Sequence, residues 1–143
     1  MKIVEGGVCA AQGFKAGGIH CGIRKNKSKR DLSMIVSTVP AHAAAVYTTN
    51  LVKGAPLLVT KEHLSDGCAQ AILCNSGNAN TCNADGVEIA QAMCTMAAQA
   101  TGLQPTDIII ASTGVIGQPL PLAPIAAGME PLAASLSEQG SAQ

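Results

Sequence analysis

Thr113 and Gly114 are the two residues of this sequence that are best placed to do chemistry. They follow the apolar run Ile108–Ser112, which is typical of a buried strand, and they begin a turn that continues to Pro119. Because glycine has no Cβ, the backbone N–H groups beside it can approach a ligand oxygen closely. The sequence therefore predicts a donor site of the oxyanion type at this strand end. A purely structural turn is the alternative, since Thr-Gly turns are common.

The distribution of charge indicates which kind of oxygen this site would take. All nine lysines and arginines lie at or before Lys61, where only two acids accompany them, so this segment has a net charge of +7. The remainder of the chain has seven acids and neither lysine nor arginine, a net charge of −7. Phosphate sites normally use a basic side chain or a full glycine fingerprint, and the pair Gly114 and Gly117 is not such a fingerprint. We therefore expect a donor site without a cation, suited to a neutral carbonyl that develops negative charge.

Other catalytic or metal-binding patterns find little support in the sequence. The histidines His20, His42 and His63 lie in no recognisable catalytic context, and the acids are scattered rather than paired. The six cysteines include no C-x-x-C pair, so reduced thiols are the simplest interpretation. A metal site with His20 and Cys21 is conceivable, but zinc ligands usually occur in pairs. We predict no metal, no cofactor and no complete catalytic machinery within this chain.

Composition indicates a single folded domain over residues 1–143. Hydrophobic residues make up 48% of the sequence, yet Phe14 and Tyr47 are the only aromatic residues, so the core must consist of small and aliphatic side chains. The overall charge is zero, which argues against nucleic acid as the main partner. The sequence contains neither a membrane span nor a signal peptide, and we expect a soluble cytoplasmic protein.

The first half of the chain predicts short strands around one basic loop. The run from Arg24 to Asp31 contains five cations and no aromatic residue, which favours a solvated loop or hairpin tip. Residues 32–39 and 43–48 are rich in β-branched residues and predict two strands of a hairpin, with Pro40 in the connection. A short helix is expected to begin at Pro56 and to end before Gly67.

The second half predicts alternating strands and helices. Residues 69–74 and 107–112 are typical of buried strands, and the Asn-rich run 75–83 between them predicts a compact polar loop. Asp85 and Glu88 resemble a capping box at the start of a helix that ends at Gly102. A last helix is expected to begin near Pro121 and to continue through residues 132–136.

Seven short segments, in order along nearly the whole sequence, carry a resemblance to a known family. They are Gly6-Gly7-Val8, Gly13-Phe14-Lys15, Gly22-Ile23-Arg24-Lys25, Arg30-Asp31-Leu32, Ala45-Val46-Tyr47-Thr48-Thr49-Asn50, Asn75-Ser76-Gly77-Asn78-Ala79-Asn80 and Ser112-Thr113-Gly114-Val115-Ile116-Gly117. Together they resemble the ornithine acetyltransferases of arginine biosynthesis, also called glutamate N-acetyltransferases. By this resemblance, Thr113 and Gly114 match the oxyanion hole of the family.

The resemblance implies a mixed α/β fold of layered sheets covered by helices, in a precursor that cuts itself into two subunits. An N-terminal threonine of the second, beta, subunit then carries acetyl from N-acetylornithine to glutamate, which releases ornithine. Some members also use acetyl-CoA as donor, and the exchange needs no cofactor. The resemblance further implies an alpha2-beta2 heterotetramer. From charge and hydropathy we expect no nucleic acid or membrane partner.

The sequence departs from the family in one respect, because it does not contain the cleavage junction or the nucleophilic threonine. We therefore expect the N-terminal, alpha-chain portion of such a precursor, incomplete at its C-terminus, inactive alone and exposing an apolar face to the part that it lacks. Two alternatives remain open. One is a fragment of a related self-processing aminopeptidase, and the other is a non-enzymatic assembly module that associates through its oppositely charged segments.

Overall fold

A helix connects two parallel neighbouring strands of the central sheet. In this computed structural model, which describes residues 3–142, β3 (Cys68–Asn75) and β4 (Ile108–Ser112) pair in parallel. Parallel strands need a long crossover, and α2 (Gly86–Thr101) supplies it. On the other side of β3, β2 (Leu32–His42) and β1 (Phe14–Ile19) add two antiparallel strands, in the order β1-β2-β3-β4. The predicted mixed α/β class is confirmed, and the described residues form one sheet.

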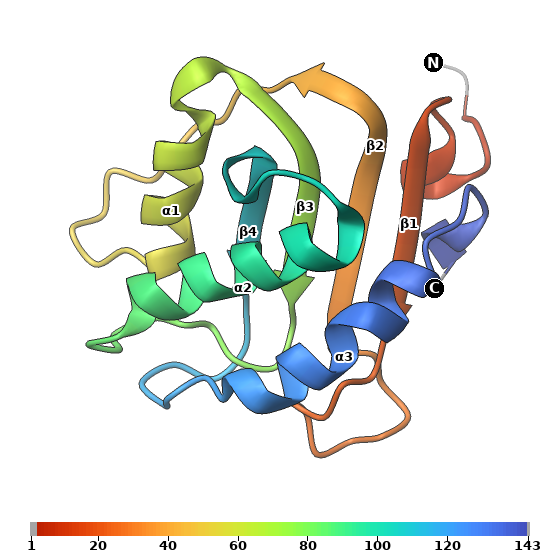
Figure 1. Cartoon of the computed structure of the whole chain (residues 1–143). Coiled ribbons are helices and arrows are strands. Elements are labelled where there is room, and N and C mark those ends of the chain that lie inside the picture. Colours follow the sequence, from red (N-terminus) through yellow and green to blue (C-terminus); the bar gives the residue numbers. More distant parts are fainter. Residues whose placement is uncertain (1–2, 143) are drawn as a thin grey trace.

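Helices cover one face of this sheet (Figure 1). α2 and α3 (Leu122–Ala134) lie across that face, and α1 (Ala55–His63) stands beside β4. Four 3-10 helices complete the regular structure of the described residues: Gly7–Cys9, Leu64–Asp66, Pro105–Asp107 and Gly140–Ala142. No helix within residues 3–142 is long and apolar enough to cross a membrane.

The core lies between the sheet and the helices and contains no aromatic side chain. Leu73 of β3 and Ile108 of β4 are fully buried against Met93 of α2 and Leu132 of α3. Small residues let the elements approach closely, because Ala90 and the other alanines of the α2 interface leave room for the neighbouring helix and strands. The expected core of small and aliphatic residues is confirmed.

The opposite face of the sheet is apolar, and no helix of residues 3–142 covers it. Side chains alternate along a strand, so the neighbours of the core residues on β2, β3 and β4 point to this face. Ile35, Ile72 and Ile109 stand side by side there, since Ile35 pairs with Ile72 and Ile72 with Ile109. Together with Phe14 they line a shallow apolar pocket, and Ile72 is 37% exposed. The sequence led us to expect an exposed apolar face, and this face is the candidate for it.

Side chains of α1 occupy the outer edge of β4. The Thr60 hydroxyl donates to the carbonyl of Ile110 (3.0 Å) and accepts from its N–H (3.2 Å). His63 Nδ1 donates to the carbonyl of Ile108 (2.8 Å). These contacts satisfy backbone groups that an edge strand would otherwise offer to another chain, so β4 ends the sheet on this side.

The predicted hairpin over residues 32–48 is wrong, because β2 is one strand that pairs on both sides. β2 pairs with β1 along Leu32–Ser37, and its pairing with β3 is interrupted between Val36 and Ala41 before it resumes. Pro40 lies in this interruption, where the pairing needs no backbone N–H from it. Residues 43–54 form no strand.

The helix predictions agree with the structure apart from the capping box. α1 has a proline in its first turn, and α2 is followed by Gly102, which has the left-handed φ of 75° that favours glycine just after a helix. Asp85 is the N-cap of α2, but its side chain makes no capping hydrogen bond. The Asn-rich loop instead holds this end, since Asn80 Nδ2 donates to the Gly86 carbonyl (2.8 Å). α3 follows Pro121 and ends at Ala134, slightly before the predicted limit.

Candidate functional site

Two loops meet beyond the carboxyl ends of β3 and β4. Asn75 and Ser112 form the last pair of the parallel ladder. The segments that follow β3 and β4 continue side by side beyond it, since Asn78 and Val115 form a parallel bridge. Thr113 N–H donates to the Asn75 carbonyl (3.0 Å), and Ala79 N–H donates to the Val115 carbonyl (2.9 Å). The turn that begins at Thr113 is therefore fixed against the Asn-rich loop that follows β3.

Gly114 is the point of closest approach between these loops. A Cβ on this residue would lie 2.5 Å from the carbonyl carbon of Gly77 and 2.8 Å from the nitrogen of Asn78. Its φ of 131° also lies in the region that side chains rarely adopt. The sequence suggested that this glycine makes room for a ligand oxygen, whereas in the structure the missing side chain makes room for the protein's own backbone.

Two adjacent hydrogen-bond donors at the start of the turn are free. The N–H of Thr113 is used in the contact with Asn75, whereas its hydroxyl and the N–H of Gly114 make no hydrogen bond to any residue in 3–142. Both residues are exposed. The available pair is thus one hydroxyl and one adjacent backbone N–H, on a segment that hydrogen bonds hold from both sides. Two adjacent donors of this kind suit an oxygen that gains negative charge.

Asn75 connects the two loops through its side chain. Its Oδ1 accepts from the N–H groups of Gly77 and Asn78 (3.0 Å each), and its Nδ2 donates to Ser112 Oγ (2.8 Å). The residue is 1% exposed. A buried amide with every polar atom engaged fixes the geometry of both loops, because any displacement leaves a donor or acceptor unpaired.

Asn78 and Asn80 continue this network toward α2. Asn78 Nδ2 donates to the carbonyl of Gln118 (2.9 Å), and its Oδ1 accepts from the N–H of Asn80 (2.8 Å). Asn80 and Cys82 have left-handed φ values of 47° and 62°, as the predicted polar loop requires. The asparagines thus hold the turn at Thr113 near its start and again near its end at Gln118.

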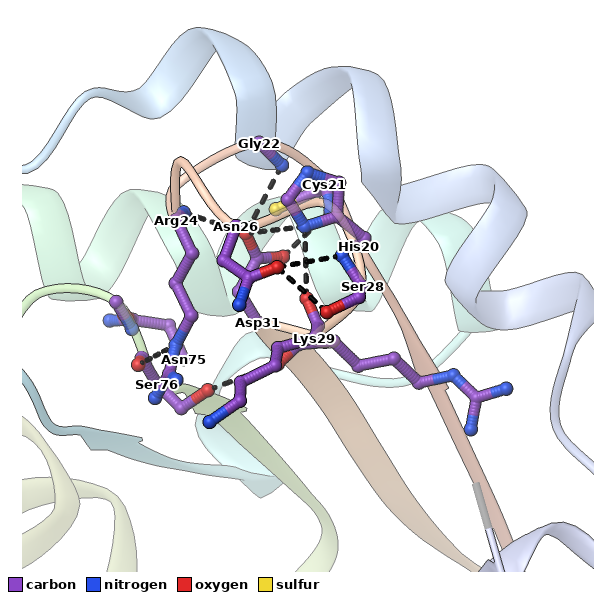
Figure 2. A network of polar contacts seen from close by, with 12 residues as sticks. His20, Cys21, Gly22, Arg24, Asn26, Ser28, Lys29, Asp31, Asn75 and Ser76 are labelled. Atoms are coloured by element: carbon purple, nitrogen blue, oxygen red, sulfur yellow. Dashed lines mark hydrogen bonds and ion pairs between the residues drawn. The ribbon is translucent and has the colours of Figure 1, made fainter.

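A cleft of about 840 Å³ opens beside Gly114, and its other wall is formed by residues 23–26, at the start of the basic loop (residues 24–30). Arg24 and Lys25 line this cleft together with Ser76, Gly77 and Gly114. Figure 2 shows the Arg24 side chain reaching to Ser76, whose carbonyl accepts from Nε. The expectation of a donor site without a cation is therefore wrong, because the fold brings cations from a segment about 90 residues away in sequence.

Asp31 organises the basic loop from within. Its fully buried carboxylate accepts from the N–H groups of Cys21 (2.7 Å), Gly22 (3.2 Å) and Arg24 (2.8 Å), and it lies 3.3 Å from His20 Nδ1. Burial of the carboxylate raises its pKa, but the N–H groups of Arg24 and Cys21 outweigh this effect, so the pKa of Asp31 falls below its usual value. The loop is a hairpin tip between β1 and β2, as predicted.

Sequence reasoning missed the role of Asp31. It is the only acid within the run from Arg24 to Leu32, and it directly precedes a strand. A single acid at the base of a basic loop is a signal for a carboxylate that binds backbone N–H groups, because it lies where the loop chain must turn.

The cysteines and histidines form no second site among residues 3–142. No three metal-ligating side chains gather there, and all six cysteines are unpaired thiols. Burial raises the pKa of Cys21 to about 11 and that of Cys94 to about 12. Both thiols therefore ionise less readily than an ordinary cysteine, which makes them poor nucleophiles.

Comparisons with known proteins point to one family. The model of the ArgJ family matches residues 15–143. The arginine biosynthesis bifunctional protein ArgJ of Symbiobacterium thermophilum is 45% identical over 99% of this chain and 36% of its own length. The protein of the same name from Caldanaerobacter subterraneus subsp. tengcongensis is 43% identical over 98% of this chain and 34% of its own length. The chain thus spans about a third of the length of these relatives.

Solved structures show the same fold at higher coverage. The crystal structure of ArgJ from Bacillus halodurans superposes with a TM-score of 0.86 and 40% identity, over 95% of this chain and 71% of that one. Ornithine acetyltransferase from Mycobacterium tuberculosis, solved in complex with ornithine, gives a TM-score of 0.88 and 32% identity, over 95% and 75%. The chain described here belongs to the ArgJ family.

Proposed function

We propose that this chain is the N-terminal, alpha-chain portion of an acetyltransferase that moves acetyl from N-acetylornithine to glutamate. The observation that carries the proposal is the fixed turn at Thr113 and Gly114, which presents one hydroxyl and one N–H without a partner among residues 3–142. Membership of a family whose members include a named ornithine acetyltransferase supports the choice of reaction.

Thr113 and Gly114 act as the oxyanion hole in this proposal. When a nucleophile attacks the acetyl carbonyl, the C=O double bond becomes a C–O⁻ single bond, and its oxygen needs donors that are already in place. The Thr113 hydroxyl and the Gly114 N–H both donate to this oxygen. The N–H of Thr113 cannot do so, because it already donates to Asn75.

The nucleophile is an N-terminal threonine on the partner beta chain. Its α-amine takes the hydroxyl proton as the new C–O bond forms, and ornithine leaves with a proton as the C–N bond breaks. The amine of glutamate then attacks the acetyl-enzyme, which releases the threonine and yields N-acetylglutamate. Acetyl-CoA is a second possible donor for the same acetyl-enzyme. No cofactor takes part.

The lengths of the relatives support the division into two chains. This chain spans about a third of the curated relatives but 71% and 75% of the chains in the solved structures. The solved chains are thus about half as long as the curated relatives, as cutting of a precursor into two subunits would give. We assign residues 1–143 to one domain of the alpha chain, and the assembly to an alpha2-beta2 heterotetramer in the cytoplasm.

The apolar sheet face at Ile35, Ile72 and Ile109 supports a covering partner. An exposed apolar surface of this kind normally lies against another part of the protein or another chain. We place the beta chain on this side, so that its N-terminal threonine reaches the end of β4 at Ser112.

An acetyl-transfer assay tests the proposal. The chain alone should not transfer acetyl from N-acetylornithine to glutamate, and the chain together with a beta chain of the family should do so. Turnover by the lone chain would contradict the division of roles. A complex that transfers no acetyl but removes residues from the N-terminus of peptides would indicate the aminopeptidase alternative. Salt-dependent self-association without either activity would indicate the assembly module.

A further inference from the structure

We propose that residues 43–49, which form no strand within this chain, become an edge strand by pairing with one strand of the partner beta chain. The inference deepens the proposed function and rests on it for the identity of the partner. It assigns part of the contact between the two chains to the backbone of one short segment, in addition to the apolar sheet face.

The backbone of this segment offers hydrogen-bonding groups that the chain itself does not use. No N–H and no carbonyl of residues 44–49 has a hydrogen-bond partner among residues 3–142. The stretch is fixed on both sides, because Ala43 N–H donates to the Gly67 carbonyl (2.8 Å) before it and Ala55 N–H donates to the Asn80 carbonyl (3.2 Å) after it. Six residues are also the length of an ordinary strand, about 5–6 residues. The segment can therefore supply a complete set of ladder bonds to another chain.

The side chains of the segment suit a strand that a partner covers. Val46, Tyr47, Thr48 and Thr49 are β-branched or aromatic, and such residues are enriched in strands. Residues 43–52 contain no charged side chain, whereas exposed edge strands commonly carry charges that oppose pairing with other chains. Val46 is nevertheless 100% exposed. An exposed and uncharged segment with strand-forming residues indicates contact with another chain.

The position of the segment connects the apolar sheet face with the donor turn. Ala43, at its start, lines the shallow apolar pocket together with Ile72, on the face where we place the beta chain. The chain then passes from the end of β2 to the start of α1 (Figure 1). Just beyond the segment, Leu51 lines another pocket together with Asn80 of the Asn-rich loop. A partner strand along the segment therefore extends from the apolar face toward the loop that holds the turn at Thr113.

The length of the relatives favours the beta chain over a second copy of this chain. This chain spans 36% and 34% of two curated relatives, so about two thirds of such a protein can supply the strand. A second copy could pair with the segment, but it would bring an uncovered apolar face of its own. The remaining part of a family protein can cover the face and pair with the segment together.

Amide hydrogen exchange resolved to single residues tests this inference. It compares the 143-residue chain with a complete enzyme, in which this chain is joined to the C-terminal two thirds of the Symbiobacterium thermophilum relative. Adjacent residues of a strand direct their N–H groups to opposite sides, so pairing on one side protects every second amide. Three alternate amides of residues 44–49 should exchange at least about 100-fold more slowly in the complete enzyme than in the lone chain. The other three should change less than about 10-fold.

Proline variants at neighbouring residues form a matched pair. Val46→Pro and Tyr47→Pro, made in the complete enzyme, remove two adjacent N–H groups, of which only one faces the partner strand. The variant at the protected amide should return the other protected amides to within about 10-fold of their exchange rates in the lone chain. The variant at the neighbouring amide should leave their protection in place.

Equal exchange of residues 44–49 in both proteins, protection of all six amides without alternation, or equal effects of the two proline variants would overturn the inference. Alternating protection in the lone chain, with a dimeric mass by light scattering, would overturn it in favour of a second copy. Exchange requires no turnover, so the two proposals fail separately. An inactive complete enzyme with the alternating pattern would contradict only the proposed reaction, and an active enzyme without the pattern would contradict only this inference.

Discussion

Gly114 and Gly77 lie so close that a Cβ on Gly114 would stand 2.6 Å from the carbonyl oxygen of Gly77. This contact joins the turn after β4 to the loop after β3, and it fixes where the free N–H of Gly114 points. The donor pair at Thr113 and Gly114 therefore depends on the packing of two backbones against one another.

Gly114→Ala should destabilise the chain by about 2–4 kcal/mol, because the new Cβ meets backbone atoms and φ is 131°. Gly117→Ala is the matched control, since φ is 72° there but nothing lies within 4 Å of the added Cβ. It should cost about 1 kcal/mol. Urea unfolding measures both, and equal losses would show that the contact with Gly77 contributes nothing.

Asn75→Ala should cost about 2–4 kcal/mol, because three hydrogen bonds disappear and buried donors remain unpaired. Hydrogen exchange at the amides of Gly77 and Asn78 should accelerate in the same variant. Asn26→Ala removes an exposed asparagine with local bonds only, and its effect should stay below about 0.5 kcal/mol. Unchanged exchange at Gly77 would contradict the proposed role of Asn75.

Acid should destabilise the chain through Asp31. Its pKa is lower in the folded state than the ordinary value of about 3.9, so its stabilising contribution is present above that value and is lost as pH falls through the folded pKa. Urea unfolding at several pH values between 7 and 3 follows this loss.

Asp31→Asn should lower stability at pH 7 by about 2–3 kcal/mol, because hydrogen bonds to a charged group are lost. The same variant should show a weaker fall in stability below pH 5. If the variant and the original chain lose stability in parallel as pH falls, other carboxylates dominate the acid response.

The thiols should differ strongly in reactivity. Cys82 is exposed, whereas Cys94 is fully buried with a pKa raised to about 12 by burial. A disulfide reagent at pH 8 should modify Cys82 first and Cys94 only upon unfolding. Cys82→Ser should remove the fast phase of labelling, and rapid labelling of Cys94 in the native chain would contradict the described core.

Local patterns explain why much of the fold could be predicted from the sequence. The signals that predict α2, its apolar spacing and the Gly102 that follows it, lie close together in sequence. The run of isoleucines in β4 likewise predicts a buried strand by itself. The error at 43–48 has a tertiary cause. β-Branched residues suit a strand, but no neighbouring strand pairs with that segment in residues 3–142.

The sequence singles out Thr113 and Gly114 as candidate site residues, but it does not show which residues surround them. Thr113 and Gly114 stand out because a hydroxyl and a glycine follow a strand. The residues around this turn are distant from one another in sequence. Asn75 lies 37 residues before its partner Ser112, and Arg24 lies 52 residues before its partner Ser76. No periodicity or spacing reports such contacts, so the cations of the cleft emerged only from the fold.

The most direct test of the donor pair is the rate of acetyl transfer in a complete enzyme that contains this chain. The chain joined to the C-terminal two thirds of the Symbiobacterium thermophilum relative, 45% identical to it, provides that enzyme. Thr113→Val should lower kcat for transfer from N-acetylornithine to glutamate about 10²–10³-fold with little change in KM, and Thr113→Ser should retain most of the rate. A Thr113→Val enzyme that turns over as fast as the original would contradict the assignment of Thr113 to the oxyanion hole.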